Sequence, residues 1–205
     1  MKLKQPDISG LLKLNKKNST PTPMIAQYLE VKDRHKDYLL FYRMGDFYEL
    51  FFDDAVIAAS NLGIALTKRG KLNDLDIPMC GVPVHSAQNY LSRLIKMGFK
   101  VAVAEQLDQN AENLKSKNQK IFKRDVVRII TPGTIIEDTL LDAKKNNNLL
   151  SIFFKEGLIS IAWIDMTTGN IKIQNIGGQN FLKDLKESIL KIEPMEIIIS
   201  DEIKN

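Results

Sequence analysis

The chain has 205 residues, of which 44% are hydrophobic and 26% are charged, which is the ordinary composition of a globular protein. No apolar run approaches the ~18 residues that a membrane span needs, and the N-terminal segment lacks the apolar core of a signal peptide. Cys80 is the only cysteine, which excludes an intrachain disulfide and a cysteine-based zinc site. We therefore expect a reduced, cytoplasmic setting.

The net charge of +4 is unevenly distributed along the chain. Residues 1–120 carry 18 Lys and Arg against 13 Asp and Glu, whereas residues 121–205 carry 11 against 12. The basic excess therefore lies in the N-terminal part and favours an anionic partner there, of which nucleic acid is the most common. The alternative interpretation is a lysine-rich protein from an AT-rich genome, in which the charge has no bearing on binding.

Strands and helices alternate in the first part of the chain. Residues 1–20 are polar without periodicity and are expected to form a mobile arm. Thr22 as an N-cap and Pro23 at the first helical position predict a helix that fades near His35. The remaining predicted elements are a strand at 38–44, a turn at Gly45 and Asp46, an extended segment from Phe47, a helix capped by Asp53 and Asp54 and ended by Gly63, a strand at 64–67, a basic loop at 68–71, a strand at 77–82, a helix capped by Ser86 and ended by Gly98, and strands at 99–104 and 126–130. This order predicts an α/β domain with a mixed sheet flanked by helices.

A second domain is expected after a polar loop at 108–120 and a linker at 135–148. Three strands joined by tight turns, a helix and a further strand are typical of the opening of a ribonuclease-H-like α/β domain. We expect this domain, over residues 149–205, to be incomplete, and the first domain to cover residues 21–134. The first strand of the second domain, at 149–154, has no carboxylate, which predicts a non-catalytic scaffold.

Motifs for nucleotide binding and for nucleophilic catalysis are absent. The sequence has neither a Walker A loop nor a G-x-G-x-x-G loop, and His35 and His85 lie fifty residues apart. An acidic cluster, made up of Asp46, Glu49, Asp53 and Asp54, is a candidate Mg²⁺ site for a nuclease. The alternative is a turn residue, one functional or surface glutamate and two helix-capping aspartates.

Phe47 and Glu49 are two positions apart in an extended segment, so we expect both side chains on one face. An aromatic ring in this position can wedge between stacked bases from the minor groove, at a cost in unstacking that is lowest at a mispair. A carboxylate close to phosphates is useful only where a base N–H or a shared proton satisfies it. The alternative is that Phe47 packs in the core and Glu49 is solvated.

The segment LLFYRMGDFYELF, at residues 39–51, resembles the Phe-x-Glu element of MutS, a family of bacterial DNA mismatch-repair proteins. Further segments resemble the family in the same order and at compatible spacing: TPMIAQYLEVK at 22–32, ALTKRG at 65–70, IPMCGVPVHS at 77–86, NYLSRLIKMGFKVAVAEQ at 89–106 and VVRIITPGT at 126–134. The resemblance covers residues 22 to about 200, which correspond to the family's mismatch-recognition domain and the first part of its connector domain.

The resemblance implies roles for six residues. Phe47 matches the stacking wedge and Glu49 the carboxylate that contacts a base. The residues that would line the groove or contact the DNA backbone are Met44, Tyr48, Lys68 and Arg69. The loop at 71–76 is more acidic than the family pattern, and we expect this to alter the backbone contacts beside it.

The resemblance also implies partners outside this chain. We expect mismatched double-stranded DNA as the ligand, a homodimer in the complete protein, a downstream repair factor of the MutL type, and a bacterial, nucleoid-associated protein in the cytoplasm. No catalytic site, metal or cofactor is expected in these residues, since ATP and Mg²⁺ would bind a C-terminal ATPase domain that they do not include. The alternatives are a metal-dependent, structure-specific nuclease, a MutS paralogue that acts on other DNA structures, and a module that binds only proteins.

Overall fold

The computed structural model describes residues 20–107, 122–135, 141, 145–155 and 158–200. The expected arm, apart from Thr20, and the polar loop at 108–120 lie outside the described residues. The chain divides into two compact units, Met1–Ile129 and Ile130–Asn205, which we describe separately. Both contain a sheet with helical cover, as predicted for a mixed α/β protein. Within the described residues, no helix is long and apolar enough to cross a membrane.

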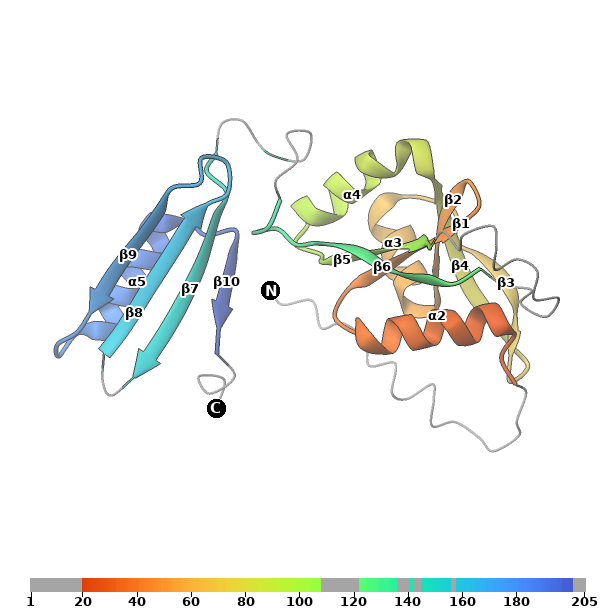
Figure 1. Cartoon of the computed structure of the whole chain (residues 1–205), viewed down its shortest axis with the longest axis horizontal. Helices are drawn as coiled ribbons and strands as arrows, with labels where there is room; N and C mark the ends of the chain where they lie inside the picture. The colour runs from red at the N-terminus through yellow and green to blue at the C-terminus, as the bar shows by residue number, and fades with distance from the viewer. Residues whose placement is uncertain (1–19, 108–121, 136–140, 142–144, 156–157, 201–205) are drawn as a thin grey trace. The chain divides into compact units, whose positions relative to one another are not determined.

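The first unit is built on a six-stranded mixed sheet with the order β3-β4-β2-β1-β5-β6 (Figure 1). The strands β1 and β2 form an antiparallel hairpin, β5 runs parallel to β1, and β4 lies antiparallel between β2 and β3. The bounds of the strands are Leu39–Met44 for β1, Phe47–Phe51 for β2, Thr67–Leu72 for β3, Leu75–Pro83 for β4, Val101–Gln106 for β5 and Arg124–Ile130 for β6.

In the described part of this unit three α-helices accompany the sheet, and two of them begin or end where local chemistry predicts. The helix α2 (Pro23–Arg34) begins after Thr22, whose hydroxyl accepts the Ile25 N–H at 3.5 Å. The helix α3 (Phe52–Leu62) ends at Gly63, which has a φ of 67° and so takes the left-handed conformation that glycine adopts without strain. The third helix, α4 (Ala87–Lys96), follows a short 3-10 turn, η1 (Val84–Ser86).

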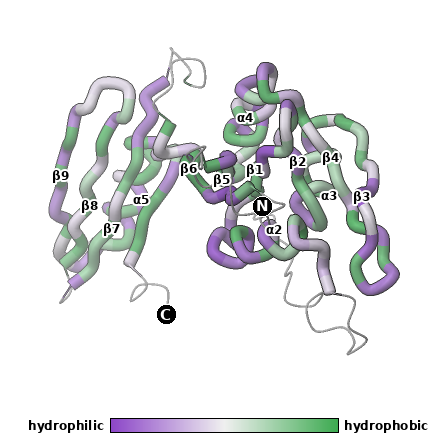
Figure 2. The backbone as a smooth tube through the Cα atoms, turned by 45° about the vertical axis from the view of Figure 1, so that its right-hand side comes forward, coloured by the Kyte–Doolittle hydropathy of each residue, from purple (hydrophilic) through white to green (hydrophobic). Residues whose placement is uncertain are grey.

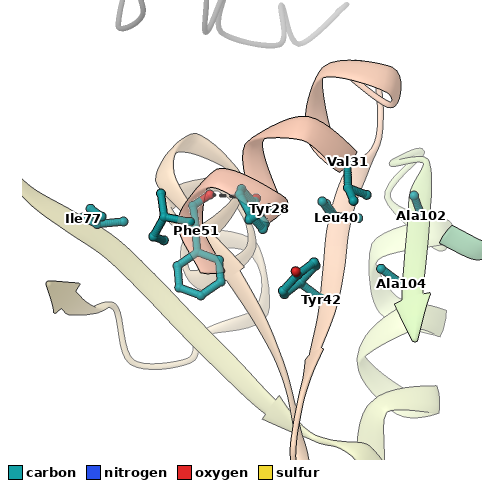
Figure 3. Packing of buried hydrophobic residues seen from close by; sticks show 9 residues of the cluster. Tyr28, Val31, Leu40, Tyr42, Phe51, Ile77, Ala102 and Ala104 are labelled. Atoms are coloured by element: carbon teal, nitrogen blue, oxygen red, sulfur yellow. Dashed lines mark hydrogen bonds between the residues drawn. The ribbon is translucent and has the colours of Figure 1, made fainter. Parts of the chain in front are cut away.

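The core of the first unit lies on both faces of the sheet. On one face, α2 packs Tyr28 against Phe51 and Tyr42, with ring centroids 4.9 and 5.5 Å apart (Figure 3). The Tyr28 hydroxyl donates to the Phe51 carbonyl oxygen at 3.4 Å, so its polar end is satisfied inside the core. The opposite face is covered by α3 and α4 (Figure 1). Because the sheet is held from both sides, the hairpin that projects from it has a rigid base.

A buried ion pair joins α2 to the start of α3. The Lys32 ammonium lies 2.9 Å from the Asp54 carboxylate, and the two side chains are 5% and 6% exposed. Asp54 also accepts the Leu40 N–H at 3.0 Å, and Lys32 donates to the Tyr38 carbonyl oxygen at 2.5 Å. Burial raises the pKa of Asp54, and these donors only partly offset the rise. Among the described residues, no buried side-chain nitrogen or oxygen lacks a hydrogen-bond partner.

Several local predictions were wrong. Residues 64–66, expected in a strand, precede β3, which begins only at Thr67. The Ser86 side chain does not cap α4, because its hydroxyl donates to the Pro83 carbonyl oxygen instead. The basic segment at 68–71 is not a loop but part of β3, which pairs with β4 through a two-residue turn in which Asn73 and Asp74 both have positive φ. β3 is an edge strand with mostly exposed residues, so it lacks the apolar alternation that marks a strand (Figure 2). The helix α3 has Phe51 at its N-cap position, without a side-chain cap, because Asp54 turns inward to Lys32 instead.

The second unit is a four-stranded sheet with the order β10-β7-β8-β9. The strands β7, β8 and β9 form an antiparallel meander, and β10 runs parallel to β7. The helix α5 packs on one face, where the buried cluster includes Leu150, Ile161 and Ile192. The bounds are Asn148–Lys155 for β7, Leu158–Asp165 for β8, Ile171–Ile176 for β9, Phe181–Ile192 for α5 and Glu196–Ile199 for β10. The sequence predicts the first of the tight turns between these strands at Glu156 and Gly157, which lie outside the described residues.

Candidate nucleic-acid interface

The end of the β1–β2 hairpin presents an aromatic ring. The turn consists of Gly45, with a φ of 59°, and Asp46, and it pairs Met44 directly with Phe47. Phe47 is 47% exposed although the next four residues of β2 are buried. Met44 lies opposite it on the same face and is half-buried. An apolar ring held on a rigid turn can enter an apolar space in a partner without a large loss of conformational entropy.

Phe47 and Glu49 lie side by side on one face, as their spacing predicts. Gly81 of β4 pairs with Glu49 of β2. A Cβ atom on Gly81 would lie 3.7 Å from the Glu49 Cγ and 3.8 Å from a Phe47 ring carbon. The two side chains therefore border the same glycine. Tyr42 pairs with Glu49 on the other side. An aromatic ring and a carboxylate thus share one end of the sheet.

The Glu49 carboxylate is bound by Arg69, a contact that the sequence reasoning missed. One nitrogen of the Arg69 guanidinium donates to both carboxylate oxygens, at 2.5 and 2.6 Å. The Glu49 side chain is 11% exposed, whereas that of Arg69 is 42% exposed. Burial raises the pKa of Glu49, and the positive charges of Arg69 and Arg124 offset part of that rise.

An irregularity in β3 places Arg69 where it can reach Glu49. The β3–β4 register shifts between Lys68 and Lys71, and Gly70 has a φ of 72° within that shift. A bulge of this kind redirects side chains on an edge strand. The strand β4 lies between β3 and β2, so the Arg69 side chain extends across it. The signal in the sequence is the single glycine in a strand, which favours a bulge.

The other predicted site residues point elsewhere. Tyr48 is buried on the opposite face of β2, where its hydroxyl donates to Glu105 and the Arg43 guanidinium lies 5.6 Å from its ring centre. Burial, reinforced by Glu105, raises the pKa of Tyr48. Lys68 pairs with Asp76 at 2.7 Å, and both side chains are exposed. The structure thus brings Phe47, Glu49, Arg69 and Met44 to one face and leaves Tyr48 and Lys68 outside this group.

A second arginine supports the hairpin close to its turn. Arg124 of β6 is buried, and its Nε donates to the Arg43 carbonyl oxygen at 2.6 Å. Its guanidinium carbon lies 5.4 Å from the centre of the Tyr42 ring, which is a cation–π distance. This contact fixes β6 to β1 at the level of the turn. It also adds positive charge near Glu49.

The predicted acidic cluster is dispersed in the fold. Glu49 is bound to Arg69, and Asp54 is buried against Lys32. In the part of the chain that the structure describes, no three His, Cys, Asp or Glu residues are placed to hold a metal ion. This geometry does not favour the nuclease interpretation, because two-metal or one-metal hydrolysis needs convergent carboxylates.

Comparisons with known proteins match the part of the chain that contains these site residues. The sequence profile of the family described as MutS domain I matches residues 22–139. The chain is 49% identical over 184 residues to the DNA mismatch repair protein MutS of Ruegeria pomeroyi, covering 90% of this chain and 20% of that protein. It is 51% identical over 186 residues to the MutS of Roseobacter denitrificans, covering 91% and 21%, and 51% identical over 180 residues to that of Wolbachia pipientis wMel, covering 88% and 21%. The chain spans about a fifth of the length of these relatives.

Proposed function

We propose that this chain, which belongs to the MutS family through its domain I, forms the mismatch-sensing part of a DNA repair protein. The observation that carries the proposal is the half-exposed Phe47 ring at the end of a rigid hairpin, beside the Glu49 carboxylate. The ligand would be mismatched double-stranded DNA.

Phe47 would act as a wedge that enters the minor groove and unstacks one base step. Unstacking costs a few kcal/mol, and it costs least where the pair is already mismatched. The protein would therefore test how easily the duplex deforms, and would read sequence only indirectly. Met44, on the same face as Phe47, would contact the groove beside the ring. Tyr48 would contribute indirectly, because its hydroxyl donates to Glu105 and so fixes the hairpin to β5.

Glu49 would accept a hydrogen bond from the base that the wedge displaces. A hydrogen bond from a base N–H offsets the electrostatic repulsion between the carboxylate and the nearby phosphates. Lys68 and Arg69 would contact backbone phosphates, which set the register of the protein on the duplex and carry no sequence information. Each of these cations is paired with a carboxylate in the structure, Lys68 with Asp76 and Arg69 with Glu49, so phosphates would have to compete with those partners.

The rest of the complete protein would supply what this chain does not include. The second unit would contain the start of a connector domain with a ribonuclease-H-like fold, and residues 135–148 would be the linker that precedes this domain. ATP and Mg²⁺ would bind a separate ATPase domain of a homodimer, which would then engage a repair factor of the MutL type.

The test compares Phe47→Ala with Phe122→Ala in the complete protein that contains this chain. The two rings are matched in exposure, at 47% and 48%. A stacked ring contributes ~1–3 kcal/mol, so Phe47→Ala should weaken heteroduplex binding about 5- to 150-fold and leave homoduplex binding nearly unchanged. Phe122→Ala should retain the preference for heteroduplex. If Phe47→Ala also retains it, the wedge assignment is wrong.

A further inference from the structure

The Glu49–Arg69 pair has one buried and one accessible member. Glu49 is held against Gly81 in the sheet, whereas 42% of the Arg69 side chain faces solvent. Arg69 lies on an edge strand beside a bulge, and Glu49 lies on a central strand. The guanidinium can therefore leave the carboxylate more easily than the carboxylate can leave the sheet.

The guanidinium also has donors beyond those that Glu49 uses. Both bonds to Glu49 come from a single nitrogen, Nη1. A guanidinium carries five N–H donors in a fork that matches phosphate oxygens. The same group can therefore neutralise Glu49 in the absence of DNA and bind a phosphate in its presence.

A carboxylate that faces DNA without a partner is repelled by the phosphates. Arg69 removes this repulsion for as long as it stays on Glu49. At a mismatch the displaced base offers Glu49 an N–H in place of the guanidinium, but a paired base keeps its hydrogen-bonding edge in the pair. The free energy of opening the ion pair is therefore compensated only where a base is displaced.

We propose that Arg69 is a positioning residue that holds the Glu49 carboxylate until a mismatch displaces a base, and then passes to a backbone phosphate as Glu49 binds that base. This inference rests on the proposed function of Phe47 and Glu49. It makes the ion pair part of the discrimination between mismatched and paired DNA, because the exchange is complete only at a mismatch.

The test is a double-mutant cycle on DNA binding by the complete protein, with Arg69→Ala, Glu49→Gln and the double variant. Non-additivity in such a cycle equals the change in the Glu49–Arg69 interaction between free and bound protein. Glu49→Gln changes the affinity for heteroduplex by some factor, which is measured once with Arg69 present and once with Ala at position 69. This factor should favour binding about fivefold more when Arg69 is present. With homoduplex, the factors measured in the two backgrounds should agree within about twofold.

Lys68 provides the matched control. It is adjacent in sequence, is also paired with a carboxylate and is also a candidate phosphate contact, but its partner is Asp76. A cycle of Lys68→Ala with Glu49→Gln should be additive on both duplexes. An Arg69 cycle that is additive on heteroduplex, or equally non-additive on both duplexes, would overturn the inference. If that happens while Phe47→Ala still abolishes the preference, only the exchange is refuted and the proposed function stands.

Discussion

Lys32 joins α2 to the start of α3 and to the segment that leads into β1. Its loss should therefore be among the most damaging single changes in the first unit. Its ammonium binds the Asp54 carboxylate at 2.9 Å and donates to the carbonyl oxygens of Lys36 and Tyr38. In Lys32→Met, Asp54 keeps the Leu40 N–H and the Tyr28 hydroxyl but loses its only ion-pair partner in the described part of the chain. Removing one member of a buried pair typically costs ~3–5 kcal/mol.

Protonation limits that cost, because the Asp54 carboxyl can become neutral once its cation is gone. Burial already raises the pKa of Asp54 in the parent protein, and the loss of Lys32 should raise it further. We therefore expect Lys32→Met to reduce the free energy of unfolding by about 4 kcal/mol at pH 7.5 and by clearly less at pH 5, where the proton is more readily taken up. Adding Asp54→Asn to Lys32→Met should recover about half of the loss at pH 7.5, since Asn carries no charge to bury.

Urea denaturation measures this effect, with two probes that separate the units. Trp163 is the only tryptophan and lies in the second unit. The urea midpoint measured by its fluorescence should therefore be nearly the same in Lys32→Met as in the parent. Far-UV circular dichroism should show that the first unit of the variant unfolds at a lower urea concentration. Lys36→Met is the control, because that side chain is 68% exposed in an ion pair with Asp33. An equal loss of stability in Lys32→Met and Lys36→Met, or a loss that does not depend on pH, would refute the reasoning.

Two further predictions concern titrating groups. Because burial raises the pKa of Glu49 in the folded state, its contribution to stability is greatest below its ordinary value of 4.5 and falls as the pH rises through the folded value. Glu49→Gln should therefore gain stability relative to the parent at pH 7.5 and show a smaller gain at pH 4.5 in urea titrations, and the opposite trend would contradict the assignment. Burial raises the pKa of Cys80 to about 11, so a thiol reagent at pH 8 should modify it at least ~100-fold more slowly in the native protein than in urea. Similar rates in both states would show that this thiol is accessible.

The elements that the sequence predicted well are those with local chemical signals. Thr22 and Pro23 at the start of α2, Gly63 at the end of α3 and Gly45 in the hairpin turn each act on the backbone within a few residues. The alternation in β2 likewise placed Phe47 and Glu49 on one face, because side chains in a strand alternate whatever the partner strand is.

The contacts that the sequence did not predict join residues far apart in the chain. Arg69 reaches Glu49 across twenty positions, and Lys32 reaches Asp54 across twenty-two. The Glu49–Arg69 pair depends on the order of the strands and on the bulge in β3. The Lys32–Asp54 pair depends on the packing of α2 beside the start of α3, which residue spacing alone does not specify. The carboxylates of the predicted acidic cluster were close in sequence, but folding gives Glu49 and Asp54 separate basic partners. Local patterns therefore predicted that Phe47 and Glu49 share one face, and only the fold identified Arg69 as the partner of the Glu49 carboxylate.

The proposed insertion of Phe47 into the duplex can be tested directly with 2-aminopurine, whose fluorescence rises when the base is unstacked. The probe is placed next to a mismatch and titrated to saturation with the complete protein, with Phe47→Ala and with Phe122→Ala. The parent and Phe122→Ala should raise the fluorescence, and saturating Phe47→Ala should not, because binding without the ring leaves the base step stacked. An equal rise with Phe47→Ala would contradict the central claim that this ring is the wedge.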